Sequence, residues 1–122
     1  MNQNRPIRVA LLGAGSVGSQ VARILLENAE ELAARVGAPL LLTGIAVRNV
    51  DAKRDVDLPK ELFTDDAERL ILGSDIVIEL MGGIDPAKHL ISLALSTGAD
   101  VVTANKALVA AHGPELFDQA RR

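Results

Sequence analysis

Ile7-Arg8-Val9-Ala10-Leu11-Leu12-Gly13-Ala14-Gly15-Ser16-Val17-Gly18 is an apolar run that leads into three glycines spaced G-x-G-x-x-G. Apolar residues at helical spacing follow over residues 17–34. A strand, a glycine turn and a helix in this order form the pattern that binds the pyrophosphate of a dinucleotide. The stretch therefore predicts a dinucleotide-binding fold, with a packing turn that holds no ligand as the alternative.

Each residue of this turn has its own expected task. Gly13 allows the tight turn out of the strand, Gly15 lets the backbone approach the phosphates, and Gly18 lets the helix pack closely on the strand. Ser16 and Val17 would present backbone N–H groups to the anion, at the positive end of the helix dipole. We therefore expect all five residues to bind the cofactor.

Length and composition narrow the classes of function. The 122 residues predict one domain, residues 1–122. A net charge of −3 without a basic block argues against nucleic acid as a partner. No apolar run approaches the ~18 residues of a membrane span, and the first residues lack the apolar segment of a signal peptide. We therefore expect a cytoplasmic protein without a membrane partner.

Metal and disulfide chemistry are not expected. The chain has no cysteine, which excludes a disulfide framework and a thiolate metal site. His89 and His112 lie far apart in the sequence and are expected on the surface of helices.

Strand and helix patterns alternate along the chain. Thr64 or Asp65 is expected to cap the second helix, Asp85 to cap the third with Pro86 in its first position, and Gly113 to break the last. This alternation predicts a Rossmann-type α/β fold, a doubly wound, mainly parallel sheet with helices on both faces. Strands are predicted at residues 7–12, 40–47, 62–63, 75–81 and 100–103, helices at 17–34, 66–72, 86–96 and 114–121, and a helical turn before the break at Gly113.

The residues after the second strand bear on the choice of cofactor. Proteins that hold NAD usually place Asp or Glu there, to accept hydrogen bonds from the adenosine ribose. This chain has Arg48, whose guanidinium can pair with a 2′-phosphate and stack on adenine. We therefore expect NADP to be preferred over NAD. The alternative is a solvated Arg48, with Asp51 as the ribose partner.

Gly82 and Gly83 end the strand predicted at 75–81, near the point of the sheet where cofactors bind. Glycines allow a ligand to approach the backbone closely. Glu79 lies within this otherwise apolar strand. It is either an ordinary strand-end carboxylate, buried and paired, or a catalytic one, and the first interpretation is favoured.

Thr103-Ala104-Asn105-Lys106 follows the last strand, at the edge where ligands gather in open α/β sheets. Thr103, Asn105 and Lys106 could together hydrogen-bond the nicotinamide ribose, orient a substrate carbonyl and stabilise developing charge. Alternatively, Asn105 only caps a helix and Lys106 is only solvated.

Four segments together resemble the N-terminal cofactor domain of homoserine dehydrogenase: residues 11–18, 46–48, 79–83 and 101–108. The resemblance spans nearly the whole chain, and its last two segments are more specific than the glycine triplet. It implies an oxidoreductase that interconverts L-homoserine and L-aspartate 4-semialdehyde with NAD(P)H. That reaction leads to threonine, methionine and isoleucine.

The resemblance also implies roles for single residues. Cofactor contacts carry over to the turn Gly13–Gly18, to Arg48, to Met81 and Gly82, and to the segment Thr103–Lys106. Lys106 matches a lysine at the junction of nicotinamide and substrate, and it is the implied catalytic residue. The family continues into a substrate-binding and dimerisation domain that is absent from this chain. We therefore expect a homo-oligomeric parent enzyme, and a chain that binds cofactor without turnover.

Two other functions fit the same motifs. One is the cofactor domain of a related amino-acid dehydrogenase, such as an aspartate dehydrogenase type, against which the segment Thr103–Lys106 argues. The other is a stand-alone NAD(P)-binding or redox-sensing module, which the short length favours. Sequence beyond Arg122 would discriminate among these possibilities.

Overall fold

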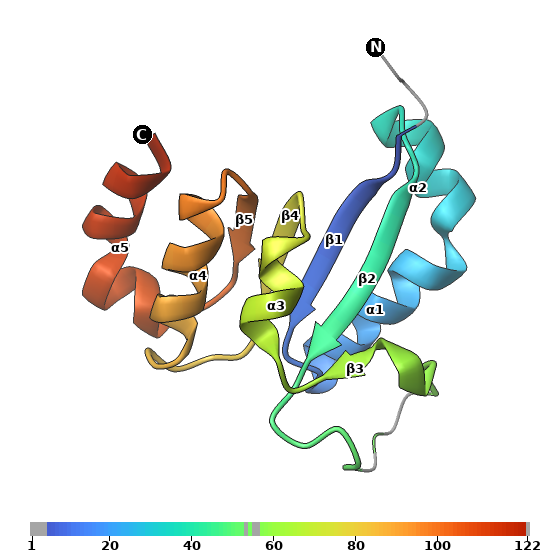
Figure 1. Ribbon diagram of the computed structural model, residues 1–122, viewed down its shortest axis with the longest axis horizontal. Helices are drawn as coiled ribbons and strands as arrows, with labels where there is room; N and C mark the ends of the chain where they lie inside the picture. Colours follow the sequence, from blue (N-terminus) through green and yellow to red (C-terminus); the bar gives the residue numbers. More distant parts are fainter. Residues whose placement is uncertain (1–4, 53, 55–56, 122) are drawn as a thin grey trace.

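Five parallel strands form the centre of the molecule. The computed structural model describes residues 5–52, 54 and 57–121, and its sheet has the order β3-β2-β1-β4-β5 (Figure 1). Every strand pair in these residues is parallel, so the predicted Rossmann-type fold is confirmed. The strands are β1 (Ile7–Leu12), β2 (Leu40–Ala46), β3 (Phe63–Thr64), β4 (Ile76–Glu79) and β5 (Asp100–Thr103).

Helices cover both faces of the sheet. In Figure 1, α3 lies in front of the strands and α1 behind them, while α5 packs on the outer side of α4. Strands β2, β3 and β4 differ from their predicted bounds by one or two residues at the ends. The helices are α1 (Ser16–Glu27), α2 (Ala29–Val36), α3 (Ala67–Leu72), α4 (Ala87–Ser96) and α5 (Lys106–Arg121), with a 3-10 helix, η1, at Lys60–Leu62.

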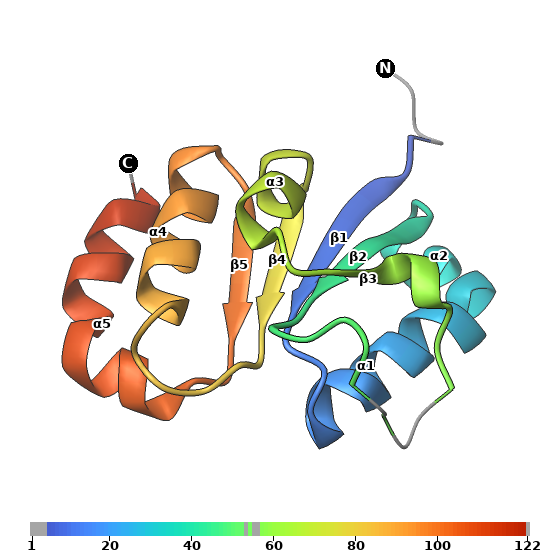
Figure 2. The same cartoon turned by 60° about the horizontal axis from the view of Figure 1, so that its bottom comes forward.

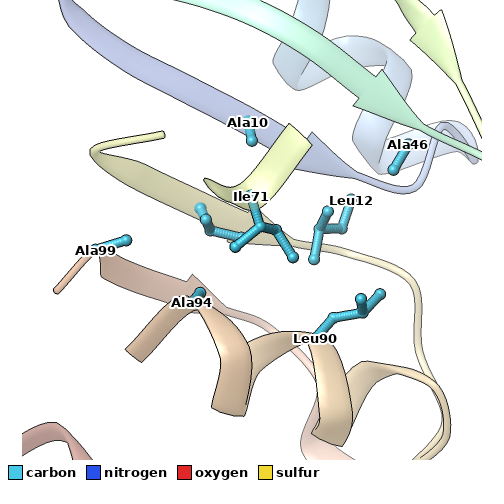
Figure 3. Close-up of a cluster of buried hydrophobic side chains, with 8 residues drawn as sticks. Ala10, Leu12, Ala46, Ile71, Leu90, Ala94 and Ala99 are labelled. Carbon is cyan, nitrogen blue, oxygen red and sulfur yellow. The ribbon is translucent and has the colours of Figure 1, made fainter. Parts of the chain in front are cut away.

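The central strand β1 is buried on both faces. Val9 and Leu11 pack against α1 on one face. Ala10 and Leu12 join a cluster with Ile71 on the other face, against α3 and α4 (Figure 3). Successive side chains of a strand point to opposite faces of the sheet, so a parallel strand covered by helices on both sides requires apolar residues at successive positions.

A bulge in β2 shifts its register against β1. Val9 pairs with Leu42, but Ala10 pairs with Gly44, so Thr43 is the extra residue. The Thr43 hydroxyl donates to the Val9 carbonyl at 3.1 Å. A Cβ on Gly44 would lie 2.7 Å from the side chain of Leu70, so this glycine allows α3 to approach β2 closely.

Two helical predictions were wrong in their bounds. The long first helix is two helices, because the chain leaves helical geometry at Asn28 (φ −107°, ψ 27°). The last segment is one helix, because α5 continues through Gly113 and Pro114. Leu108 and Leu116, on either side of Gly113, both pack into the cluster with α4. This shared packing outweighs the hydrogen bond that Pro114 cannot donate.

The cap of α3 also differs from the prediction. Asp66, and not Thr64 or Asp65, caps this helix, because its carboxylate accepts from the Arg69 amide at 3.2 Å. The Thr64 hydroxyl instead accepts from the Asp66 amide at 3.0 Å. Thr64 therefore fixes the turn that precedes the cap.

The start of α4 also differs from the prediction. The helix begins at Ala87, with Pro86 in the capping position and no side-chain cap. The Lys88 amide donates to the Ile84 carbonyl at 2.7 Å. A backbone acceptor thus takes the place of the side chain predicted from Asp85.

Candidate functional site

The predicted site residues lie at one edge of the sheet. Because the strands are parallel, their carboxyl ends meet there, and Figure 2 shows the connections after β1, β4 and β5 along that edge. Gly13 directly follows β1, and Arg48 lies two residues beyond β2. Met81 and Lys106 lie just beyond β4 and β5. The fold therefore brings together residues that are widely separated in sequence.

Gly13 and Gly18 are required by packing. Gly13 has φ +104°, and a Cβ on it would lie 3.2 Å from the carbonyl oxygen of Leu80 and 3.3 Å from Cα of Met81. A Cβ on Gly18 would collide with the carbonyl oxygen of Gly13. These glycines thus hold the start of α1 and the residues after β4 close to the end of β1.

Gly15 differs from both. Its backbone is extended (φ −70°, ψ −165°), and a Cβ on it would meet no other described atom within 4 Å. Gly15 precedes α1, and no side chain caps this helix. Ser16 and Val17 are exposed residues. Their amides belong to the first turn of the helix, which has no intrahelical acceptor. This arrangement fits an anion held by backbone N–H groups.

Arg48 is exposed at the end of β2. It lines a hollow of about 370 Å³ together with Met81, Glu68 and His89. His89 is exposed, as predicted, and its Nε2 lies 3.8 Å from the Glu68 carboxylate. Within the part of the chain that the structure describes, the Arg48 guanidinium has no ion pair, so its charge is available to a ligand.

Glu79 is fully buried at the end of β4. One carboxylate oxygen accepts from the Thr103 hydroxyl at 2.6 Å. The other accepts from the amides of Met81 at 2.8 Å and Gly82 at 3.3 Å, and from the Asn105 side chain at 3.4 Å. The expectation of a buried carboxylate is confirmed, and its partners are hydrogen-bond donors.

The side chain of Asn105 is used within the protein. Its Oδ1 accepts from the Leu108 amide at 3.1 Å and caps α5. Its Nδ2 donates to the Gly83 carbonyl and to Glu79. The alternative that Asn105 caps a helix is therefore confirmed, and its contact with the cofactor stays a prediction.

Lys106 is the first residue of α5, and it is exposed. It lines a hollow of about 490 Å³ with Thr103, Ala104 and Val109. Its ammonium forms no ion pair with the described residues. A positive charge at a helix N-terminus opposes the helix dipole. Helix stability therefore gives no reason for a lysine here, whereas a functional role does.

Other titratable groups lie on the surface. His112 Nδ1 lies 3.1 Å from the Glu115 carboxylate, and Lys88 Nζ lies 3.4 Å from it. The His112 hydrogen bond, followed by Lys88, lowers the pKa of Glu115 below its ordinary value of 4.5. In the described ranges, no group of three or more His, Asp or Glu side chains could hold a metal ion. No helix found there has the length and apolar character to cross a membrane.

Comparison with known proteins identifies the family. The family profile described as "Homoserine dehydrogenase, NAD binding domain" matches residues 13–122. The chain belongs to the homoserine dehydrogenase family. The homoserine dehydrogenases of Mycobacterium tuberculosis and Bacillus subtilis are 52% and 40% identical to it, over 95% and 96% of the chain. The predicted resemblance is confirmed, and the matched part of the family is its NAD-binding domain.

Solved homoserine dehydrogenases have the same fold. The Staphylococcus aureus enzyme is 34% identical, with a TM-score of 0.87 over 96% of this chain and 31% of that chain. A hyperthermophilic archaeal homoserine dehydrogenase, solved in complex with NADPH, is 22% identical with a TM-score of 0.72, over 96% of this chain and 41% of that chain. The chain spans only about a quarter of its curated relatives, 26% of the Mycobacterium tuberculosis enzyme.

One feature of this homoserine dehydrogenase domain was missed by the sequence analysis. Glu79 bonds residues at the ends of both β4 and β5. Its signal was an acidic residue within an apolar strand. Its partners on the β5 side lie 24 and 26 positions away, which no local spacing rule detects.

Proposed function

We propose that the chain is the nucleotide-cofactor domain of a homoserine dehydrogenase, with residues 1–122 acting as one domain, and that it binds NADP(H) in preference to NAD(H). The observation that carries cofactor binding is Gly15. Packing requires glycine at positions 13 and 18, but it leaves open space beside residue 15. A glycine without a packing reason, before a helix without a capping side chain, fits the close approach of a pyrophosphate.

The contacts follow from the edge at which these residues meet. Backbone groups of the turn would hold the pyrophosphate, and residues after β4 and β5 would hold the nicotinamide half. The proposed cofactor contacts are Gly13, Gly15, Ser16, Val17, Gly18, Arg48, Met81, Gly82, Thr103, Asn105 and Lys106.

Arg48 supports the preference for NADP(H). Its exposed guanidinium stands where an acidic residue would bind the ribose of NAD, and it can form a bidentate pair with a 2′-phosphate. The archaeal relative was solved with NADPH, while the family description of an NAD binding domain keeps NAD as the alternative.

Parallel titrations with NADPH and NADH test this preference. We expect the unaltered chain to bind NADPH more tightly, and Arg48→Ala to reduce the difference by about tenfold. Arg69→Ala, on α3, is the matched control and should change neither affinity. Equal affinities of the unaltered chain for both cofactors would contradict the preference.

In the whole enzyme, the cofactor held by these residues would supply an acceptor for the hydride that L-homoserine loses from the carbon bearing its hydroxyl, and the hydroxyl proton would pass to solvent, giving L-aspartate 4-semialdehyde. Lys106 would hold a positive charge beside that oxygen as its charge changes. Substrate-binding residues would come from the part of the relatives that this chain does not cover. We place this parent enzyme in the cytoplasm as a homo-oligomer.

Lys106→Ala in the full-length enzyme tests the catalytic role. We expect kcat for homoserine oxidation to fall about 100-fold, with little change in the Kd of NADPH. Lys88→Ala, another lysine on the surface, is the control and should keep normal turnover. Near-normal kcat in Lys106→Ala would refute the role. The 122-residue chain alone should bind NADPH and oxidise no homoserine.

A further inference from the structure

Glu79 stands out because of where its carboxyl group lies. Among the described residues, it is the one ionisable side chain that is buried, with no exposed surface. No cation pairs with it there. A buried carboxylate without a cationic partner must be satisfied by hydrogen-bond donors. The position of those donors indicates what the residue does.

All of the donors come from the carboxyl ends of two neighbouring strands and the loops that follow them. The Met81 and Gly82 amides belong to the loop between β4 and α4. The Thr103 hydroxyl lies on the last residue of β5, and the Asn105 side chain belongs to the connection between β5 and α5. Outside Glu79, the two loops are joined by the hydrogen bond from Asn105 to the Gly83 carbonyl.

The direction of the Thr103 bond is fixed. Its Oγ1 accepts from the Asn105 amide at 3.0 Å, and its own proton is donated to Glu79 at 2.6 Å. The same Asn105 caps α5 through the Leu108 amide. A chain of hydrogen bonds thus runs from Glu79 through Thr103 and Asn105 to the helix on which Lys106 is the first residue.

We propose that Glu79 is a positioning residue, which locks the loop after β4 to the loop after β5 so that both contact the cofactor in one fixed arrangement. This inference rests on the proposed function, because it assumes that these loops hold the cofactor. Glu79 itself does not touch the cofactor or the reacting atoms. It acts through Thr103 and Asn105, and through the Met81 and Gly82 amides.

Substitutions at Thr103 separate positioning from general stability. Thr103→Val keeps the shape of the side chain but removes the hydroxyl that links β5 to Glu79, whereas Thr103→Ser keeps that hydroxyl. Thr43→Val is the matched control, because it removes a threonine hydroxyl bond of the same sheet, to Val9. All variants are compared by NADPH titration and by thermal unfolding of the 122-residue chain.

We expect Thr103→Val to raise the Kd of NADPH about tenfold, and Thr103→Ser to restore it to within about twofold. Thr43→Val should lower the Tm by a similar amount to Thr103→Val and leave the Kd unchanged. If Thr103→Val and Thr43→Val bind NADPH equally well, the positioning role is overturned.

Amide hydrogen exchange without cofactor gives an independent readout. Glu79→Gln replaces one acceptor oxygen by a donor, so the Met81 and Asn105 amides should exchange faster while the amides of β1 keep their protection. Unchanged exchange at both residues would overturn the lock, even if the variant unfolds at a lower temperature. If the unaltered chain does not bind NADPH, the proposed function fails, and the exchange experiment still decides whether the lock exists.

Discussion

The glycine turn (Gly13–Gly18) and the Glu79 cluster (Glu79, Met81, Gly82, Thr103 and Asn105) lie at the same edge of the sheet, but they are built in opposite ways. The turn depends on missing side chains, which let backbone approach backbone. The cluster depends on buried polar side chains that bond each other across two strands. In the turn, packing demands glycine at positions 13 and 18 but not at position 15, whereas in the cluster the same hydrogen bonds hold the fold together and join the two loops proposed to contact the cofactor.

The difference predicts how each region responds to mutation. A substitution in the turn should lower chiefly the free energy of unfolding at Gly13 or Gly18, and chiefly cofactor affinity at Gly15. A substitution in the cluster should affect both together. The predictions below test this contrast.

Gly18→Ala should have the largest effect. Its Cβ would collide with the Gly13 carbonyl oxygen. The Cβ is fixed to the backbone of α1, and the carbonyl belongs to the backbone that follows β1. Neither group can therefore move aside without shifting α1 from β1. We expect a loss of about 3 kcal/mol in the free energy of unfolding, measured by urea denaturation. A variant as stable as the unaltered chain would show that the packing account of the turn is wrong.

Asn105→Ala should cost about 2 kcal/mol of unfolding free energy. It removes the α5 cap and leaves the Gly83 carbonyl and Glu79 without one donor each. The control is Asn28→Ala, because Asn28 precedes α2 without a side-chain cap bond. Asn105→Ala should also weaken NADPH binding. A variant that loses stability but binds NADPH normally would contradict the expectation that a substitution in the Glu79 cluster affects both properties.

Gly15→Ala should leave the fold intact and weaken the binding of the cofactor. The added methyl meets no other described atom within 4 Å, so the free energy of unfolding should change by less than about 1 kcal/mol. The Kd of NADPH should rise about tenfold, or about 1.4 kcal/mol, because the methyl would occupy the space proposed for the pyrophosphate. Unchanged affinity would count against the anion site.

Glu115 lies outside both regions and should give the smallest effect. Its pKa is lowered in the folded chain, chiefly by His112, so its contribution to stability is present above pH 4.5 and is lost as the pH falls through the folded pKa. Comparing the Tm of Glu115→Gln with that of the unaltered chain between pH 7 and pH 3 should show the difference shrinking at acid pH. NADPH affinity at pH 7 should be equal in both.

Much of the fold was predictable because its signals are local. The bounds of β1 and β5 agree with the prediction, and the glycine turn follows β1 as expected. The errors came where tertiary contacts override local preference. Glycine followed by proline usually ends a helix. Here Leu108 and Leu116, on either side of Gly113 and Pro114, pack together against α4, and this packing stabilises one continuous helix.

The candidate site likewise contains residues whose roles could be predicted from the sequence and residues whose roles could not. Gly18 could be assigned from spacing, because it packs on Gly13 five positions earlier, whereas the close approach of Gly13 to Leu80 and Met81 could not. The role of Glu79 could not, because its partners come from two strands that only the parallel sheet places side by side. For Asn105 both suggested roles were visible in the sequence, and only the bond to Leu108 selects the helix cap.

The order of the strands limits how the sheet could be enlarged. At one flank, β3 offers only two residues, while β5 at the other flank offers four, and its residue Val102 is 56% exposed. Within the described residues, no further strand pairs with the outer edge of β5, and this edge is the longer template for an additional strand. The sheet could therefore be extended more readily beside β5 than beside β3.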